Sequence, residues 1–488
     1  MLNRKSGFTN STKKDTCTHV KRRFTGVAQN SYQNSPIVLV DVRKMSIFRA
    51  YDIRGIYGKD LTDEVMKKIG MAVGTYSPGD FTVGRDFREH SDQLEKAFIS
   101  GLITTGSNAH LIGTCPASLC VFANWRLKNN VAAYITASHL PAEWNGVKFF
   151  HQDGVGFFEN ENKKLEEIHT SGPFKEGKGS IKKVEGMEEK YTDFILERIK
   201  PKRLKAVVDF GNGAACLTVP KILKNFDFEA KYLYDWPDPT FPNRDPEPKP
   251  ESLTVLCRKV VEDEADLGIA FDADGDRALF VDEKGKVMMA EQSAVFFMRD
   301  IMKTQRGPIV ANIECSSLID DEAKKYGQPV FRIPVGHTFL VQQTKKHNAV
   351  LGVEKSGHIC VPKFYWFDDA IINSIYMIEI VSKLGRKVSE IQEEMPIEYF
   401  ERIEIDSTDE TKFEIVEKIK EEAMKNYEKI TTIDGVRIDF PDSWALIRAS
   451  NTSPKLRLTV EAKNEERLRE LKKEMITLIT GARAKCEQ

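Results

Sequence analysis

Short apolar runs alternate with helix-periodic segments along most of the chain. Residues 81–84 and 131–135 are apolar runs closed by glycine or polar residues, which predicts short buried strands, whereas residues 93–104 have the apolar spacing of a helix. Apolar runs at 204–210 and 307–313 each begin another strand-then-helix pattern. We therefore expect three similar α/β units in succession, although their identity is too low to define a sequence repeat.

The C-terminal part of the chain has a different pattern. It opens with a strand-like run at 397–405 and a charged amphipathic helix at 409–427. Three more strand-like runs and a last helix follow at 436–440, 444–447, 456–460 and 464–478. Consecutive strands of this kind favour one antiparallel sheet, so we expect an α+β domain here. Residues 236–250, rich in proline, predict an irregular surface loop earlier in the chain.

Length and composition set limits on the class of protein. A chain of 488 residues is expected to hold about two to four domains, and its 41% hydrophobic and 30% charged residues indicate a globular protein. The formal net charge of −1 provides no global field that would attract nucleic acid or an anionic membrane. No run approaches the roughly 18 apolar residues of a membrane span, and no secretion signal opens the chain. We therefore expect a cytoplasmic protein whose partners are neither nucleic acids nor membranes.

The eight cysteines are scattered, without a CxxC pair or a framework spacing, which indicates reduced thiols. Cys115 and Cys120 are the closest pair, but a zinc site would need two further ligands at a recognisable spacing and none follows. Packing as buried small side chains is the favoured interpretation.

Residues 1–44 differ from the rest of the chain. They contain nine Lys or Arg, only two Asp and little apolar periodicity before residue 37. We interpret them as an extension, either a disordered arm or sequence upstream of a natural start at Met45, and an organelle transit segment is the alternative.

A serine directly after a predicted buried strand is the first candidate for chemistry. Ser138 stands in the run TASHLP, where its hydroxyl would project from a tight turn as a nucleophile or would cap a helix. A serine hydrolase is not indicated, since no GxSxG motif is present and the adjacent His139 cannot easily turn back to form a triad. A phosphoryl carrier remains, provided that partners exist elsewhere in the chain.

Three alternating carboxylates follow another apolar run. Asp272, Asp274 and Asp276 lie within five residues and are followed by Arg277. Like charges this close would raise one another's pKa unless a cation neutralises them, and Mg²⁺ is the cation that hard oxygen ligands favour. A calcium loop matches only in part, because its sharp turn requires glycine where Arg277 stands. The alternative is a solvated acidic turn.

Two further polar segments could bind a phosphorylated sugar. Glu354 and Ser356 alternate after an apolar run, so in an extended segment both would face one way and could bond sugar hydroxyls. Residues 448–457 combine guanidinium, hydroxyl and amide donors in a turn between predicted strands, which suits a phosphate. A surface loop and an ordinary hairpin are the respective alternatives.

Together these segments indicate two places for phosphate, one that exchanges it and one that holds it. No GxxxxGK[ST] motif is present, and the kinase catalytic-loop partner of residues 209–211 is absent. An enzyme that moves a phosphoryl group between two positions of one small molecule fits best.

The chain resembles the α-D-phosphohexomutases, in particular the phosphomannomutase/phosphoglucomutase branch. The resemblance spans residues 48–479 and rests on motifs in family order: FRAYDIRG, VGRDFR, TASHLP, NGVK, DADGDR, VEKSGH and RASNTSPKLR. It implies three similar α/β domains with mixed sheets plus a C-terminal α+β domain, arranged around a central cleft. The expected domains, after the extension, are residues 45–187, 188–287, 288–396 and 397–488.

The resemblance also implies roles for individual residues. The catalytic residues would be Ser138 as phosphoserine, Lys148 and His139 for proton transfer, and Arg54 and Arg277 near the transferring phosphoryl. Metal ligands would be Ser138, Asp272, Asp274 and Asp276. Substrate would contact Tyr51, His337, Glu354, Ser356, His358, Arg448, Ser450, Asn451, Thr452 and Arg457. Neighbouring positive charge is expected to lower the pKa of Lys148.

By the same resemblance, phospho-Ser138 donates to O6 or O1 of a hexose phosphate of mannose or glucose. The hexose 1,6-bisphosphate then turns end over end and returns the other phosphoryl to the serine. Mg²⁺ is the implied cofactor, the partners are small sugar phosphates, and the protein would be a monomer or small homo-oligomer.

Three positions depart from the family pattern and bear on substrate choice: Leu140, Val353 and Glu314. The NTSP sequence after residue 450 is closer to the mannose/glucose branch than to the glucosamine branch, whose loop tends to read SGTEP. Two alternatives stay open. One is a haloacid-dehalogenase phosphatase that uses Asp272 as its nucleophile, and the other is a non-catalytic sugar-phosphate sensor.

Overall fold

The computed structural model describes residues 46–396, 399–450 and 454–486, so the predicted extension over residues 1–44 lies outside the described residues. The first sheet has the order β1-β5-β4-β2-β3-β6. Its strands are β1 (Ile53–Ile56), β2 (Asp80–Arg85), β3 (Asn108–Thr114), β4 (Val131–Ile135), β5 (Trp144–His151) and β6 (Ile181–Lys183). The accompanying helices are α1 (Asp63–Tyr76), α2 (Ser91–Leu102), α3 (Ala117–Leu127) and α4 (Glu159–Ser171).

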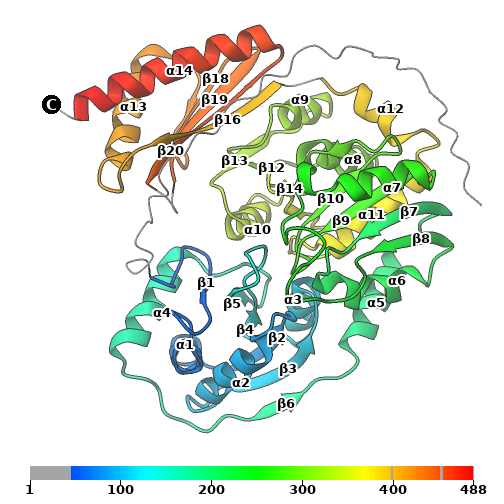
Figure 1. Cartoon of the computed structure of the whole chain (residues 1–488), viewed down its shortest axis with the longest axis vertical. Helices are drawn as coiled ribbons and strands as arrows, with labels where there is room; N and C mark the ends of the chain where they lie inside the picture. The colour runs from blue at the N-terminus through cyan, green and yellow to red at the C-terminus, as the bar shows by residue number, and fades with distance from the viewer. Residues whose placement is uncertain (1–45, 397–398, 451–453, 487–488) are drawn as a thin grey trace, which may run out of the picture. The chain divides into compact units, whose positions relative to one another are not determined.

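Two smaller mixed sheets follow (Figure 1). The second contains β7 (Leu204–Asp209), β8 (Phe228–Leu233), β9 (Leu267–Phe271), β10 (Ala278–Val281) and β11 (Val287–Met288). The third contains β12 (Ile309–Asn312), β13 (Val330–Ile333), β14 (Leu351–Val353) and β15 (Ile359–Cys360). Their helices are α5 (Met187–Arg198), α6 (Val219–Leu223), α7 (Thr254–Glu262), α8 (Ala290–Ile301), α9 (Leu318–Lys325), α10 (His337–Lys346), α11 (Ala370–Lys383) and α12 (Val388–Glu393).

One strand order is common to these three sheets. It reads β5-β4-β2-β3 in the first, β10-β9-β7-β8 in the second and β15-β14-β12-β13 in the third. In each, three neighbouring strands pair in parallel and the strand at one end pairs antiparallel through a hairpin. The three units that seemed too divergent to form a sequence repeat are therefore repeated in topology.

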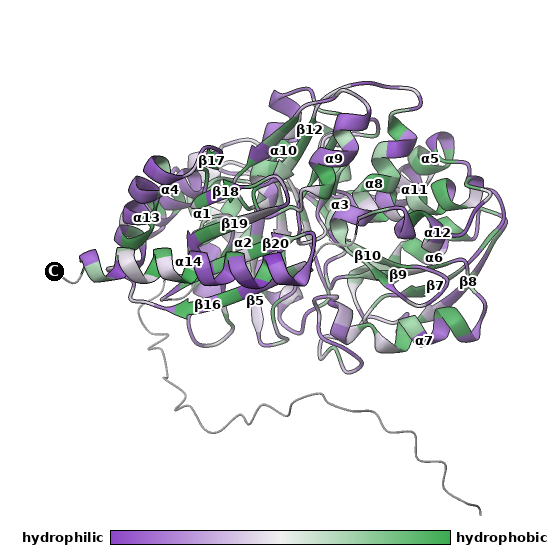
Figure 2. Ribbon diagram, turned by 90° about the horizontal axis from the view of Figure 1, so that it is seen from above, coloured by the Kyte–Doolittle hydropathy of each residue, from purple (hydrophilic) through white to green (hydrophobic). Residues whose placement is uncertain are grey.

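The C-terminal unit is the predicted α+β domain with an antiparallel sheet of order β16-β20-β19-β18-β17. Its elements are β16 (Tyr399–Asp406), α13 (Lys412–Asn426), β17 (Ile430–Thr431), β18 (Val436–Asp439), β19 (Ser443–Ala449), β20 (Lys455–Ala462) and α14 (Glu465–Cys486). Apolar residues from both helices and from the sheet form one core, and Figure 2 shows hydrophilic and hydrophobic residues alternating along α14. The last helix extends eight residues beyond the predicted end at residue 478.

The proline-rich passage has no strand or helix before a short 3-10 helix at Pro250–Ser252, as predicted. Its expected surface position is only partly correct. Arg244 is buried, and its Nε donates to Asp209 Oδ1 at 3.0 Å. Glu247 accepts a hydrogen bond from Arg277 Nη1 at 3.0 Å. The loop therefore supports the segment that carries the three aspartates.

One apolar core joins the three α/β units. It includes residues of α3, of β9 and of α11, so the three α/β units share one core rather than forming separate globules. At its centre, the ring of Phe122 lies 4.9 Å from Tyr191 and 5.2 Å from Phe194, measured between centroids. Tyr365 from the third unit contacts the same ring. Aromatic packing thus fixes the units against one another.

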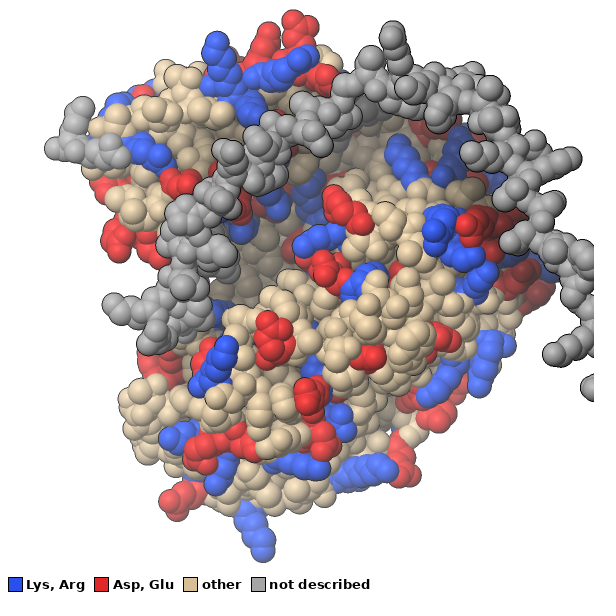
Figure 3. All heavy atoms as spheres, viewed as in Figure 1, with Lys and Arg blue, Asp and Glu red and all other residues tan. Residues whose placement is uncertain are grey.

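Several expectations from composition concern the surface and the thiols. Acidic and basic side chains are interspersed over the face shown in Figure 3. Cys115, Cys120, Cys216, Cys257, Cys315 and Cys360 are free thiols, and all of them except Cys257 are buried, which agrees with reduced cysteines. Among the described helices, none is long and apolar enough to cross a membrane.

The shared aromatic core generates a stability prediction. Phe122→Ala is expected to lower the free energy of unfolding by about 3–5 kcal/mol, because it removes a fully buried ring that three units contact. Phe413→Ala is the control, since that side chain is 55% exposed, and its effect should stay within about 0.5 kcal/mol. Urea unfolding followed by tryptophan fluorescence measures both, and equal small effects would contradict the shared core.

Candidate functional site

The predicted functional segments occupy corresponding places in the repeated topology. Residues 136–143 connect β4 to β5, residues 272–277 connect β9 to β10, and residues 354–358 connect β14 to β15. Each is the connection of the antiparallel hairpin that ends the four-strand order common to the three sheets. A fourth hairpin, between β19 and β20, holds the predicted phosphate segment, of which residues 451–453 are outside the described residues.

Ser138 lies in a turn with a left-handed backbone, at φ +53°. Its amide donates to Thr136 Oγ1 at 2.8 Å, and its hydroxyl donates to Asp274 Oδ1 at 3.0 Å. Because residues 136–143 contain no helix, Ser138 is not a helix cap. The side chain is buried and directed toward the aspartate loop of the second unit, which is the partner that a phosphoryl carrier requires.

His139 reaches the serine more closely than expected. Its Nδ1 lies 3.4 Å from Ser138 Oγ, which corrects the expectation that an adjacent histidine could not turn back. Burial strongly lowers the pKa of His139, and the positive charges of Arg277 and Arg54 add to that effect. The ring is therefore neutral and can hydrogen-bond this oxygen, but burial and the two arginines oppose its taking up a further proton.

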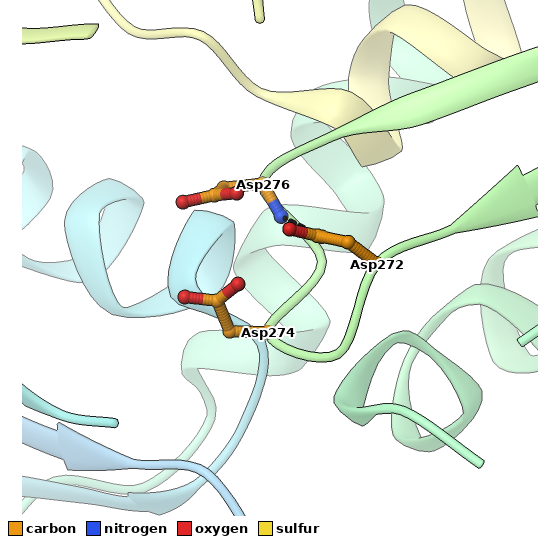
Figure 4. A group of neighbouring side chains, drawn as sticks. All are labelled: Asp272, Asp274 and Asp276. Atoms are coloured by element: carbon orange, nitrogen blue, oxygen red, sulfur yellow. Dashed lines mark hydrogen bonds between the residues drawn. The ribbon is translucent and has the colours of Figure 1, made fainter. Parts of the chain in front are cut away.

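The three aspartates converge and are buried (Figure 4). One oxygen of each lies within 4.8 Å of the others, and among the described residues this is the single His/Cys/Asp/Glu group of three that could hold a metal ion. Asp272 Oδ1 accepts the amides of residues 275, 276 and 277 at 3.0–3.1 Å, so this carboxylate shapes the loop. Asp276 Oδ1 has no hydrogen-bond partner. The burial and convergence exclude a solvated acidic turn.

Two cations neutralise this cluster. Lys148 Nζ donates to Asp274 Oδ2 at 2.8 Å and to Asp276 Oδ2 at 2.7 Å, and Arg277 Nε donates to Asp272 Oδ2 at 3.0 Å. Burial by itself would lower the pKa of Lys148, but the two carboxylates outweigh it and raise that pKa above its usual value. The lowered pKa expected from neighbouring positive charge is therefore wrong for this arrangement.

The pKa values of Asp272 and Asp276 are shifted in opposite directions. Burial, together with repulsion from Asp276 and Asp274, raises the pKa of Asp272 well above its ordinary value. Burial also acts to raise the pKa of Asp276, but Lys148, His358 and Arg277 hold it well below. Asp276 is thus kept charged by the cations around it.

Glu354 and Ser356 contact each other, but not through the alternation along an extended segment that the sequence predicted. Residues 354–358 form a turn and not an extended segment, and Gly357 takes the left-handed φ of +101°. Within this turn Ser356 Oγ donates to Glu354 Oε1 at 2.7 Å, and the amide of Gly336 donates to Glu354 Oε2 at 3.1 Å. Glu354 is buried, so the segment is not simply a surface loop.

Two histidines stack at this turn. The rings of His337 and His358 stack at 5.6 Å, and Nδ1 of His358 lies 2.6 Å from Asp368 Oδ2. Burial opposes charge on His358, but Asp276 and Asp368 raise its pKa to about 9. Burial lowers the pKa of His337 to about 4. The stacked pair therefore holds one charged and one neutral imidazole.

Tyr51 lies close to the same turn. Its hydroxyl donates to the carbonyl of Val335 at 3.3 Å. Burial raises the pKa of Tyr51 to about 12, and the charges of Asp434 and Glu354 act in the same direction. The phenol thus stays protonated between the turn over residues 354–358 and the C-terminal domain.

Arg448 is the anchor of the predicted phosphate segment. Its Nη1 lies 3.1 Å from Glu314 Oε1 and its Nη2 lies 2.9 Å from Asp434 Oδ2, while its buried Nε has no hydrogen-bond partner. Glu314 also accepts from Arg402 Nη2 at 2.9 Å. Glu314, which departs from the family pattern, thus forms an ion pair with the guanidinium that a phosphate would need.

The remaining predicted residues differ in position. Ser450 is buried and its amide donates to the carbonyl of Lys455 at 2.9 Å, whereas Asn451 and Thr452 are among the residues not described. Arg457 pairs across the strands with Arg448 and lies 3.6 Å from Glu404. Arg54 lies 2.6 Å from Asp52 and keeps a buried Nε without a hydrogen-bond partner.

The sequence pattern assigned no role to four buried or half-buried groups beside the site: Asp86, Arg88, Glu247 and Asp368. Asp86 and Arg88 belong to VGRDFR and contact the serine loop, although they precede it by about fifty residues. Glu247 lies in the proline-rich loop. Asp86 and Arg88 could have been found from the sequence, because they are charged residues just after a predicted buried strand. No sequence signal marked Glu247 or Asp368.

Models of known families match nearly the whole described chain. Residues 45–176 match "Phosphoglucomutase/phosphomannomutase, alpha/beta/alpha domain I", residues 185–285 match domain II and residues 290–399 match domain III. Residues 404–478 match the C-terminal domain of the same series. The four matches occur in the order that the motifs predicted.

Individual relatives are similar to this chain over most of its length. The chain is 35% identical over 442 residues to "Probable phosphoglucosamine mutase" of Methanopyrus kandleri, covering 88% of this chain and 97% of the relative. It is 33% identical over 435 residues to "Phosphomannomutase/phosphoglucomutase" of Pseudomonas aeruginosa PAO1, covering 88% and 94%. A crystal structure of a phosphoglucomutase/phosphomannomutase family protein from Burkholderia thailandensis superposes with a TM-score of 0.83 at 26% identity, covering 90% of this chain and 97% of that one. The chain therefore belongs to the phosphoglucomutase/phosphomannomutase family, the α-D-phosphohexomutases.

Proposed function

We propose that the protein interconverts hexose 1-phosphate and hexose 6-phosphate, of mannose, glucose or both, through a phosphoserine at position 138 and a hexose 1,6-bisphosphate. The observation that carries this proposal is the 3.0 Å hydrogen bond from Ser138 Oγ to Asp274, which joins a buried hydroxyl to a buried acidic cluster of another unit. A hydroxyl in that position can carry a phosphoryl group next to a cation.

The donor set suits Mg²⁺. Three carboxylates supply hard oxygens, Asp276 Oδ1 is buried without a partner, and no sulfur or imidazole ligand competes within this group. Asp272, Asp274, Asp276 and the phosphorylated Ser138 would hold the ion. When bound, it would supply positive charge that stabilises the equatorial oxygens of the transferring phosphoryl.

The chain's own residues perform the rest of the transfer. Arg277 and Arg54 place positive charge beside the phosphoryl, and their buried guanidinium nitrogens without partners can donate to its oxygens. Lys148 and His139 are the proposed proton-transfer residues beside Ser138. Because Lys148 is charged in this arrangement, it can donate a proton to the oxygen that the phosphoryl group leaves, while neutral His139 can hydrogen-bond the serine oxygen. The bisphosphate then turns, and Ser138 accepts the second phosphoryl.

The opposite end of the substrate would be held by the C-terminal domain. Arg448, Ser450, Asn451 and Thr452 would bind the phosphate that is not transferring, with Arg457 at the edge, because a guanidinium can bind phosphate oxygens in bidentate fashion. Glu354 and Ser356 would accept and donate hydrogen bonds to sugar hydroxyls. Tyr51, His337 and His358 would line the space between these groups.

The haloacid-dehalogenase alternative is disfavoured by the contacts of Asp272. Both of its oxygens already accept hydrogen bonds, three from backbone amides and one from Arg277, so this carboxylate is built into the loop and is not free to attack phosphorus. A sugar-phosphate sensor would bind substrate without turnover, even after priming with glucose 1,6-bisphosphate. A coupled assay comparing mannose 1-phosphate, glucose 1-phosphate and glucosamine 1-phosphate separates these possibilities and ranks the substrates.

The proposal also includes a cytoplasmic location and a monomeric or small homo-oligomeric protein that acts on free sugar phosphates. The domain limits 45–187, 188–287, 288–396 and 397–488 remain part of it. Support comes from the family matches, whose four segments fall within about three residues of those limits at five of their eight ends.

Ser138→Ala is expected to abolish both mutase activity and labelling of the protein by ³²P-glucose 1,6-bisphosphate, because it removes the accepting oxygen. The label on the unaltered protein should survive acid, as a phosphate ester does. Ser100→Ala, which removes an exposed hydroxyl from α2, should label normally. Undiminished labelling of Ser138→Ala would rule out this nucleophile.

Asp276→Asn is expected to weaken binding of Mg²⁺ or Mn²⁺ by at least about tenfold in isothermal titration calorimetry, since it removes one charged ligand of the cluster. Asp282→Asn is the matched control, because that buried carboxylate accepts only backbone amides of its own turn and the amide side chain can replace it. Equal affinities for the two variants would exclude the aspartate cluster as the metal site.

Arg448→Lys is expected to raise the KM for hexose phosphate by about tenfold or more, because an ammonium cannot make the bidentate contact with phosphate. Labelling of Ser138 should continue, since the two sites are separate. Arg467→Lys, on the surface of the same domain, should leave the KM unchanged. An unchanged KM in Arg448→Lys would remove the proposed phosphate anchor.

A further inference from the structure

Arg88 is a buried arginine whose two terminal nitrogens donate to the loop of the proposed nucleophile. Its Nη2 donates to the carbonyls of Ser138 and Leu140 at 2.6 and 2.7 Å. Its Nη1 donates to the carbonyls of Pro141 and Trp144 at 2.7 and 3.0 Å. One guanidinium therefore binds four backbone carbonyls within a segment of seven residues.

The fifth donor of Arg88 joins a second chain of hydrogen bonds to Ser138. We call Arg88, Asp86 and Thr136 together the brace of the serine. Arg88 Nε donates to Asp86 Oδ2 at 3.1 Å, and the same oxygen accepts from Thr136 Oγ1 at 2.8 Å. Thr136 Oγ1 in turn accepts the amide of Ser138 at 2.8 Å. The peptide groups on both sides of the Ser138 Cα are thus fixed, one through Arg88 and the other through Thr136 and Asp86.

The backbone of Ser138 needs such support. A φ of +53° is the left-handed region, which a residue with a side chain adopts at a cost unless the surroundings hold it there. No helix or strand stabilises residues 136–143. A guanidinium offers five donors in a rigid fork, and here all five have acceptors.

We propose that Arg88, together with Asp86 and Thr136, is a positioning device that holds Ser138 Oγ at the correct place and angle for phosphoryl transfer. The inference rests on the proposed role of Ser138 as nucleophile. Arg88 contacts the backbone of the loop and makes no hydrogen bond or ion pair with those described residues that are assigned to the sugar. Its effect should therefore fall on transfer and not on substrate binding.

The second unit takes part in the same arrangement. The guanidinium of Arg88 lies 5.2 Å from the ring centroid of Phe241, in the proline-rich loop. That loop also supplies Glu247 to Arg277, so one segment contacts both the brace of the serine and the base of the aspartate loop. Position of the nucleophile and position of the metal ligands are therefore linked through residues 241–247.

Arg88→Lys tests the inference. We expect the rate of phosphoryl transfer from glucose 1,6-bisphosphate to the enzyme, measured by rapid quench, to fall about 100-fold, because a small displacement of a reacting atom has an effect of that size. The KM for hexose phosphate should change by less than about threefold. Arg299→Lys, which alters a partly buried guanidinium paired with Glu322 on the third unit, should transfer at the normal rate.

Rescue distinguishes positioning from a general loss of stability. Added guanidinium should restore transfer in Arg88→Ala by about tenfold or more in a saturable manner, whereas ammonium should not. If Arg88 variants do not fold, Thr136→Val removes the brace on the amide side of Ser138 and should lower the transfer rate by about tenfold with an unchanged KM.

The outcomes separate the two proposals. If Ser138→Ala still becomes labelled, the nucleophile assignment fails and the inference fails with it. If Ser138→Ala is not labelled but Arg88→Lys, or Thr136→Val in its place, transfers within about threefold of the normal rate, only the positioning role of the brace is overturned. Absence of guanidinium rescue in folded Arg88→Ala would overturn it as well.

Discussion

Three buried carboxylates within one short loop must be neutralised, and the rest of the site follows from that requirement. Lys148 from the first unit and Arg277 from the loop itself supply positive charge to them, and Ser138 donates its hydroxyl to the same cluster. Since the charges come from different units, the aspartate loop gathers its partners only in the assembled fold. The aromatic core around Phe122 keeps these units in contact.

Repetition of one topology explains where the chemistry lies. The serine loop, the aspartate loop and the turn over residues 354–358 are the corresponding hairpin connections of three sheets that share one strand order. A hairpin at the end of a buried strand is free to carry polar residues, while the parallel strands beside it supply a rigid base. In the proposed function, three copies of one unit thereby provide the nucleophile, the metal site and a sugar contact without any change of scaffold.

The sequence predicted those parts of the site whose signal is local. Ser138 and the aspartates stand out because small or acidic residues directly follow apolar strands, and the repeated strand-helix pattern predicted the fold class. Contacts over long separations were not predictable, such as Arg88 with the carbonyl of Ser138 or Glu247 with Arg277. The pKa of Lys148 was predicted in the wrong direction because a pattern lists neighbouring charges without their distances.

The central claim is that a phosphoserine and a divalent ion share one site. Phosphorus NMR of the protein after treatment with glucose 1,6-bisphosphate measures this directly, with Mn²⁺ added in place of Mg²⁺. The account predicts a phosphate-ester resonance that Mn²⁺ broadens strongly, because the paramagnetic ion would lie beside phospho-Ser138. An ester resonance that stays sharp in Mn²⁺, or an acyl-phosphate resonance in its place, would contradict it.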